Sequence, residues 1–104
     1  MRTFVCLTVA TLFAATAAMA APTALTLKGA SLAPLAGVTL PAARATALAA
    51  RPGIITDQEL EKEAGGTGLR YSFDIKSKGK AFEVGVDART GKLLENKAEG
   101  PHAD

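Results

Sequence analysis

The stretch that most restricts the fold is "LRYSFDIKSKGKAFEVGVD", residues 69–87, because it has the pattern of two strands around a tight turn. Apolar residues occupy every second position on both sides of a central Ser-Lys-Gly-Lys: Leu69, Tyr71, Phe73 and Ile75, then Phe82, Val84 and Val86. Such alternation is typical of strands that bury one face. A two-residue turn at Lys78 and Gly79 pairs every apolar residue with an apolar partner, whereas a slip of one residue would destroy the match. The sequence therefore predicts a hairpin of fixed register.

A helix is expected before this hairpin, in "TLPAARATALAARPG", residues 39–53. Thr39 suits the N-cap, Pro41 suits the first turn, and Pro52-Gly53 is a stop signal. One narrow stripe of the helix is apolar: Leu40, Ala43, Ala47 and Leu48. A stripe of this kind needs a sheet to cover it. We therefore expect an α+β fold, with one N-terminal helix packed on a small antiparallel sheet of three to four strands.

The intervening segment "IITDQELEKEAGGTG", residues 54–68, is ambiguous by composition. Residues from Asp57 onward have good helical propensity, while Ile54 to Thr56 favour a strand. Propensity alone would favour a helix. The strand assignment adopted below depends on a family resemblance.

The chain begins with the pattern of a secretory signal peptide, residues 1–20. Arg2 supplies the basic start, an apolar stretch follows, and Ala18 and Ala20 fit a cleavage site after Ala20. The alternative is an uncleaved membrane anchor, since no charge occurs between Arg2 and Lys28, but Pro22 interrupts the run. Cleavage predicts a periplasmic or secreted protein without a membrane segment, and it removes Cys6, the one cysteine, so no thiol chemistry is expected.

The mature chain is nearly neutral, because cleavage removes one of 12 basic side chains and none of the 10 acidic ones. This balance argues against a nucleic-acid-binding surface. Residues 21–38 mix Ala, Thr, Leu, Gly and Pro without a period and are interpreted as a linker that lies loosely on the domain. The domain is expected at residues 39–98 and a disordered tail at 99–104.

The segment "VDARTGKLLE", residues 86–95, concentrates groups that could do chemistry. It contains fragments of an aspartic protease loop, a phosphorylated-aspartate loop and a P-loop, but the spacing fails for each. A turn fits better, in which Asp87 caps backbone N–H groups and Gly91 is left-handed. Leu93 is then expected beside Val86 on the core face.

Catalytic, metal and cofactor sites are not expected in this chain. Its one histidine, His102, lies in the tail, so a serine nucleophile would lack a base and a zinc site would lack ligands. An enzyme is therefore the least favoured class.

The ordered pattern over residues 39–95 resembles the PepSY domain family. The matching features are an Ala-Ala-Leu helix that ends in Pro-Gly, a Tyr-x-x-x-Ile strand at Tyr71, a Gly-Lys hairpin at Gly79 and a Val-Asp-x-x-Thr-Gly turn at Val86. The resemblance implies one helix on an antiparallel sheet, an edge strand over about Ile54 to Lys62, and a non-catalytic module of secreted and envelope proteins that regulates peptidases. The glycine-rich "AGGTG" loop, residues 64–68, departs from the family pattern.

These observations favour a non-enzymatic secreted or periplasmic protein that binds and restrains a peptidase or another envelope protein. The alternative is a structural or ligand-sensing envelope module with no peptidase target. The expected partner face is polar and carries Arg70, Ser72, Asp74, Glu83 and Leu94. On this face Leu94 is expected opposite Gly85. Asp74 is expected opposite Glu83, either screened by Lys76 and Lys80 or in contact with a weakly held cation or a partner.

Overall fold

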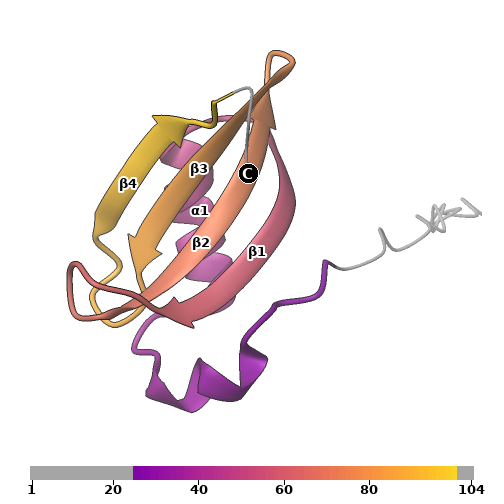
Figure 1. The fold of residues 1–104 in the computed structure, drawn as a ribbon. Coiled ribbons are helices and arrows are strands. Elements are labelled where there is room, and N and C mark those ends of the chain that lie inside the picture. The colour runs from indigo at the N-terminus through magenta and orange to yellow at the C-terminus, as the bar shows by residue number, and fades with distance from the viewer. Residues whose placement is uncertain (1–24, 101–104) are drawn as a thin grey trace, which may run out of the picture.

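The computed structural model describes residues 25–100, in which one helix packs against a four-stranded antiparallel sheet (Figure 1). The elements in chain order are η1 (Ala30–Leu35), α1 (Leu40–Ala50), β1 (Ile54–Lys62), β2 (Leu69–Ser77), β3 (Lys80–Asp87) and β4 (Leu93–Ala98). The strands are adjacent in the order β1-β2-β3-β4, and α1 contacts β2, β3 and β4. The predicted α+β fold is confirmed. The expected signal peptide and His102 lie outside the described residues.

Helix α1 begins and ends at the signals present in its sequence. The Thr39 hydroxyl oxygen accepts a hydrogen bond from the Ala42 N–H at 3.3 Å, as an N-cap does. Pro41 follows in the first turn, where its missing N–H costs nothing. Arg51 leaves the helical conformation with φ −140° and ψ 90°, and Pro52 prevents continuation. Neither helix in the range 25–100 is long and apolar enough to span a bilayer.

The β2–β3 hairpin has the predicted register. Its Cα partners include Tyr71 with Val86, Phe73 with Val84 and Ile75 with Phe82. Lys78 and Gly79 form the turn with positive φ values of 50° and 77°. This geometry matches a type I′ turn, whose twist suits that of the flanking strands.

The first nine residues of the ambiguous segment form an edge strand, β1, as the family resemblance implied. Its ladder with β2 shifts register between Ile55 and Asp57, and the bulge aligns the following residues with the core. Gln58 is only 4% exposed, yet its amide is satisfied. The side-chain oxygen accepts from Arg44 Nη1 at 2.6 Å, and the side-chain nitrogen donates to the Leu25 carbonyl at 2.9 Å. Tertiary burial thus overrides the helical propensity of this segment.

The segment before α1, expected as a loosely lying linker, contacts the domain from residue 25 onward. Lys28 forms a parallel bridge with Glu59, in which the Lys28 N–H donates to Gln58 O at 3.1 Å and Leu60 N–H donates to Lys28 O at 2.8 Å. η1 then contacts β1. The apolar residues of the whole segment before α1 show no regular spacing in the sequence, because the segment is mostly irregular backbone. Four of them pack against the core: Leu27, Leu32, Ala36 and Val38.

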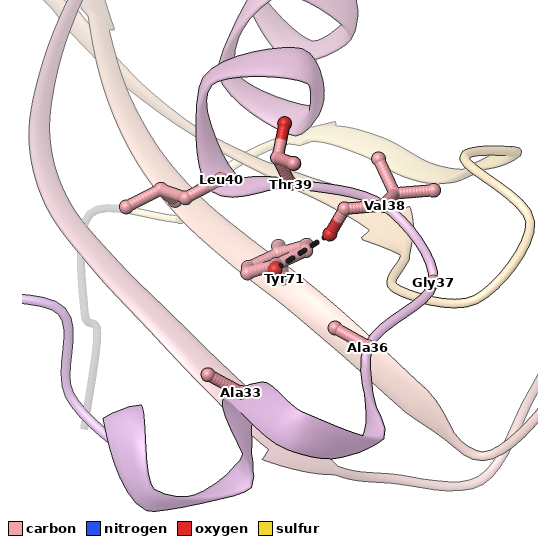
Figure 2. A pocket seen from close by; sticks show the side chains of 7 residues that line it. All are labelled: Ala33, Ala36, Gly37, Val38, Thr39, Leu40 and Tyr71. Atoms are coloured by element: carbon pink, nitrogen blue, oxygen red, sulfur yellow. Dashed lines mark hydrogen bonds between the residues drawn. The ribbon is translucent and has the colours of Figure 1, made fainter.

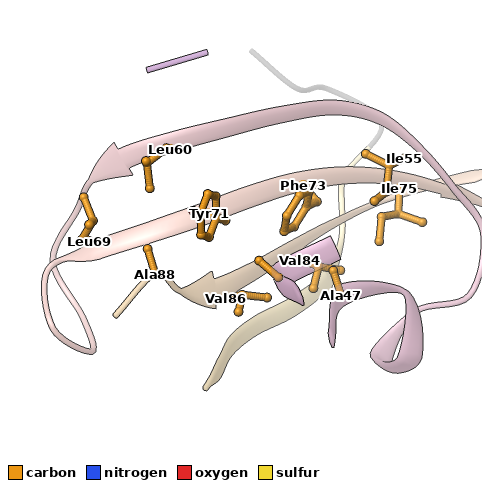
Figure 3. Packing of buried hydrophobic residues seen from close by; sticks show 11 residues of the cluster. Ala47, Ile55, Leu60, Leu69, Tyr71, Phe73, Ile75, Val84, Val86 and Ala88 are labelled. Atoms are coloured by element: carbon orange, nitrogen blue, oxygen red, sulfur yellow. The ribbon is translucent and has the colours of Figure 1, made fainter. Parts of the chain in front are cut away.

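The core fills the space between the sheet and α1 (Figure 3). The Tyr71 and Phe73 rings stack at its centre, with centroids 6.2 Å apart. Ala43 and Ala47 are fully buried, so the helix approaches the sheet closely through small side chains. The remaining buried members come from the strands and the β3–β4 turn: Ile55, Leu60, Leu69, Ile75, Val84, Val86 and Ala88.

Replacing Ala47 by Leu should destabilise the domain by about 1–3 kcal/mol, because the larger side chain would push α1 away from a filled core. The matched control is Ala49→Leu, at an exposed position of the same helix, which should be nearly neutral. Urea unfolding followed by circular dichroism measures both. Equal stability of the two variants would contradict the close helix–sheet contact.

Candidate functional site

The segment with the most candidate chemical groups, residues 86–95, is a turn organised by the Asp87 carboxylate. Asp87 is 1% exposed. Its Oδ1 accepts hydrogen bonds from the backbone N–H groups of Arg89 at 2.9 Å and Thr90 at 3.0 Å. Gly91 has a φ of 79° and donates its N–H to Asp87 O, while Asp87 N–H donates to Lys92 O. The predicted cap and left-handed glycine are both confirmed.

Asp87 has a second set of donors that the sequence reasoning missed, in the β1–β2 loop. Thr67 donates its backbone N–H to Oδ2 at 2.7 Å and its hydroxyl to Oδ1 at 2.9 Å. Gly66 lies so close that a Cβ at this position would collide with Asp87 Oδ2. The glycine-rich loop that departs from the family pattern therefore allows a close approach to the carboxylate. The need for these donors could have been expected from the sequence, because a buried carboxylate requires more hydrogen-bond donors than the backbone of its own turn supplies.

Burial alone would raise the pKa of Asp87, but hydrogen bonding outweighs it. The backbone N–H groups of Thr67, Thr90 and Arg89, together with the Thr67 hydroxyl, hold the pKa of Asp87 well below its ordinary value of 3.8. The carboxylate is therefore charged and fully engaged at neutral pH. Both oxygens are occupied by donors from the fold, so the group is not placed to accept a proton from a substrate or to attack one.

A small pocket of about 230 Å³ opens between η1 and the start of α1, with Tyr71 in its lining (Figure 2). The Tyr71 hydroxyl donates to the Val38 carbonyl at 2.8 Å. Burial raises the pKa of Tyr71, which keeps the hydroxyl protonated. The other lining residues offer no titratable side chain: Ala33, Ala36, Gly37, Val38, Thr39 and Leu40. This pocket therefore contains no side chain placed for catalysis. Tyr71 serves instead to hold the segment before α1 through its hydrogen bond to Val38.

Among the described residues, no helix covers the face of the sheet opposite α1 (Figure 1), and three of the five predicted partner residues lie there in one patch: Ser72, Asp74 and Glu83. Asp74 faces Glu83 directly, and Ser72 faces Gly85, as predicted. On the β1 side, the Ser72 hydroxyl donates to Glu61 Oε1 at 2.7 Å. Lys97 is the Cα partner of Glu83 in the β3–β4 ladder, so a lysine of β4, which was not expected here, neighbours the acidic pair.

The prediction that Leu94 lies opposite Gly85 is wrong. The β3–β4 ladder shifts register between Gly85 and Val86, so Glu95 faces Gly85. Leu93 pairs with Val86 as expected, but it is 39% exposed and so does not lie in the core. The half-buried Leu94 falls in this irregularity, and a Cβ on Gly66 would come within 3.0 Å of its side chain. Leu94 thus packs against the β1–β2 loop.

Arg70, expected on the rim of the face, is instead buried beneath acidic side chains. Its Nη2 donates to the Ala64 carbonyl at 3.1 Å, and its Nη1 contacts Glu95 Oε2 at 3.3 Å. Glu63 lies 3.9 Å from Nε, which has no hydrogen-bond partner among residues 25–100. The guanidinium therefore links the β1–β2 loop, through Ala64, to β4, through Glu95.

The outer face is predominantly acidic. Its carboxylates come from all four strands and from the residue after β4: Asp57, Glu59, Glu61, Asp74, Glu83, Glu95 and Glu99. Lys28 holds Asp57 at 2.9 Å, and Lys97 holds Glu95 at 2.7 Å. Helix α1, on the other side, contains no acidic residue. Acidic side chains therefore predominate on the outer face, although Lys28, Arg70 and Lys97 contact some of them there.

Several acidic side chains on this face, and Glu63 in the adjoining β1–β2 loop, have raised pKa values. The pKa of Glu99 is raised first by its hydrogen bond with Asp74, and then by burial. The pKa of Glu83 is raised first by burial and then by the charge of Glu95. The pKa of Glu63 is raised first by its hydrogen bond with Glu61, against the opposing effect of Arg70. The carboxylates of this face thus repel one another, and contact with a cationic group would reduce that repulsion.

The described residues do not include a group of three or more His, Cys, Asp or Glu side chains arranged to hold a metal ion. Along the acidic face the carboxylates are spread over the width of four strands. The arrangement suits contact with an extended charged surface.

Replacing Asp87 by Asn should destabilise the domain by about 2–4 kcal/mol at pH 7, because the amide nitrogen would face donors and the charge would be lost. Since the folded pKa of Asp87 is depressed, its contribution is complete above the ordinary pKa of 3.8 and falls as the pH drops through the folded value. The stability difference between wild type and variant should therefore shrink in strong acid. Urea unfolding over a pH series tests this, and a constant difference would contradict it.

Asp74→Asn makes the same chemical change, Asp to Asn, in the acidic face, but it is not expected to destabilise the domain. Removal of the Asp74 charge should lower the pKa of Glu99 toward its ordinary value of 4.5 without loss of stability at pH 7. NMR titration of the Glu99 carboxyl measures the shift. An unchanged Glu99 pKa would show that the two carboxyls do not interact.

Comparison with known proteins agrees with this architecture. The search of curated proteins finds no significant match, and neither does the search of solved structures. A family model described as "Peptidase propeptide and YPEB domain" matches residues 38–97, which include α1 and nearly the whole sheet. The chain therefore belongs to the PepSY family.

Proposed function

We propose that this protein is a non-enzymatic, exported binding module that restrains a peptidase by docking through the acidic outer face of its sheet. Membership of the family supports a role related to peptidase inhibition. The single observation that carries the proposal is the acidic sheet face that no described element covers, since α1 and η1 contact the rest of the fold from the core side. The signal-peptide pattern in the sequence supports export.

The chemistry of the face selects a partner with a basic surface. Asp74 and Glu83 lie side by side at its centre, and neither forms an ion pair within 4.0 Å in the range 25–100. Lysine or arginine side chains of a partner would relieve the repulsion between them and form charge-assisted hydrogen bonds. A binding module also needs no catalytic group, in keeping with the structural use of Asp87 and Tyr71.

The test is inhibition of a panel of secreted and envelope peptidases by the protein purified after export. At least one peptidase should be inhibited, and inhibition should weaken as salt rises because exposed charges are screened. Affinity capture from the periplasm of the host identifies other partners. Capture of envelope components without inhibition of any peptidase would support the structural or ligand-sensing alternative instead.

The double variant Asp74→Asn/Glu83→Gln should weaken inhibition by about tenfold or more, since it removes both central charges. The matched control is Ala42→Lys/Ala49→Lys, which changes the net charge equally at exposed positions of α1. Inhibition constants for the three proteins locate the contact. Equal losses in both variants would mean that net charge, and not this face, governs binding.

A further inference from the structure

A second surface feature lies at the opposite end of the sheet from the Asp87 turn, where the β2–β3 hairpin extends beyond the C-terminus of α1 (Figure 1). It is a hollow of about 390 Å³. Its lining combines cationic and apolar side chains with one hydroxyl: Arg51, Pro52, Ser77, Lys78, Lys80 and Phe82. This volume falls within the range of small-ligand pockets.

The positive charge of this hairpin-end pocket is not compensated by neighbouring residues. In the part of the chain that the structure describes, no acidic side chain lines it. Within residues 25–100, Arg51, Lys78 and Lys80 make no salt bridge. The pocket is therefore suited to an anion.

The Arg51 guanidinium is held in place on two sides. Its Cζ lies 3.9 Å from the centroid of the Phe82 ring, and its Nε donates to Asn96 Oδ1 at 3.1 Å. Asn96 is itself fixed, because its Nδ2 donates to the Ala50 carbonyl at 3.3 Å. The terminal Nη groups of Arg51 have no acceptor among the described residues and remain available to a ligand. A pre-positioned planar guanidinium favours bidentate binding of a carboxylate.

The remaining walls specify what the carboxylate is attached to. Phe82 is half-buried and Pro52 is exposed, so together they offer apolar surface beside the charge. The C-terminal end of α1, at Ala50, carries partial negative charge, which disfavours a dianionic phosphate more than a carboxylate. We infer that the hairpin-end pocket binds a carboxylate carried by an apolar group. A peptide C-terminus with an apolar last residue and a free N-acyl amino acid share this chemistry. The inference does not depend on the proposed peptidase contact.

The first experiment is an NMR titration of the protein, purified after export, with N-acetyl-L-phenylalanine. Backbone shifts should change at Arg51 and from Ser77 to Phe82, and not at the acidic face. The matched probes are N-acetyl-L-phenylalanine amide, which lacks the charge, and inorganic phosphate, which lacks the apolar group. Both should bind at least about tenfold more weakly. Equal binding of the amide, tighter binding of phosphate, or no shift at these residues would overturn the inference.

Variants then assign the binding to named side chains. Arg51→Gln should weaken binding by about tenfold or more, and Lys80→Gln by roughly threefold. Arg51 also contacts Phe82 and Asn96, so Arg51→Gln could prevent folding. Lys80 is exposed, and Lys80→Gln therefore tests the pocket even in that case. Lys62→Gln, an equal charge change at the far end of β1, should have no effect. Equal weakening by Lys62→Gln and Lys80→Gln would overturn the assignment.

A third titration separates the two sources of the carboxylate. A tetrapeptide that ends in Phe supports a peptide C-terminus if it binds at least about tenfold more tightly than N-acetyl-L-phenylalanine. Equal affinities support a free N-acyl amino acid. An equally tight interaction with the C-terminally amidated tetrapeptide would overturn the inference for both sources.

Discussion

The buried carboxylate of Asp87 is the interaction on which the arrangement of this small domain depends. It joins the β3–β4 turn to the β1–β2 loop through Thr67, across sequence separations that no single element spans. The next residue extends the connection, because the Ala88 carbonyl accepts N–H groups from Gly37 and Val38 before α1. A charge buried in this way is stable only while every donor is present. The most enzyme-like segment of the sequence is therefore fully used in folding.

The sequence predicts those parts of the fold that depend on local patterns. The register of the β2–β3 hairpin follows from period-two alternation and a two-residue turn, and α1 follows from Thr39, its alanine stripe and Pro52. Strand β1 could not be assigned in this way. Its residues favour a helix locally, and only burial of one face beside β2, with Gln58 satisfied from Arg44 and Leu25, makes the strand the stable state.

The errors and omissions arise where packing between distant segments decides the conformation. The β3–β4 ladder was expected to continue in simple register, but Leu94 packs against the Gly66 loop and a shift places Glu95 opposite Gly85. The same loop supplies Thr67 to Asp87. Arg70 was expected on the rim of the outer face because it alternates with the apolar Leu69 and Tyr71, whereas its guanidinium is enclosed by Ala64 and Glu95. None of these contacts leaves a periodic signal in the sequence.

The near-neutral chain has two surfaces of opposite charge character. Carboxylates gather on the open sheet face, while Arg51, Lys78 and Lys80 line the hairpin-end pocket. The near-zero net charge therefore does not predict what the molecule attracts. A basic surface would be attracted to the open sheet face, and an anion to the hairpin-end pocket. Salt weakens contacts at exposed carboxylates more than contacts at a stacked, partly enclosed guanidinium. Two ligands of opposite charge could thus bind the same small domain without competing, provided that neither disturbs Asn96, which links Arg51 to the end of α1.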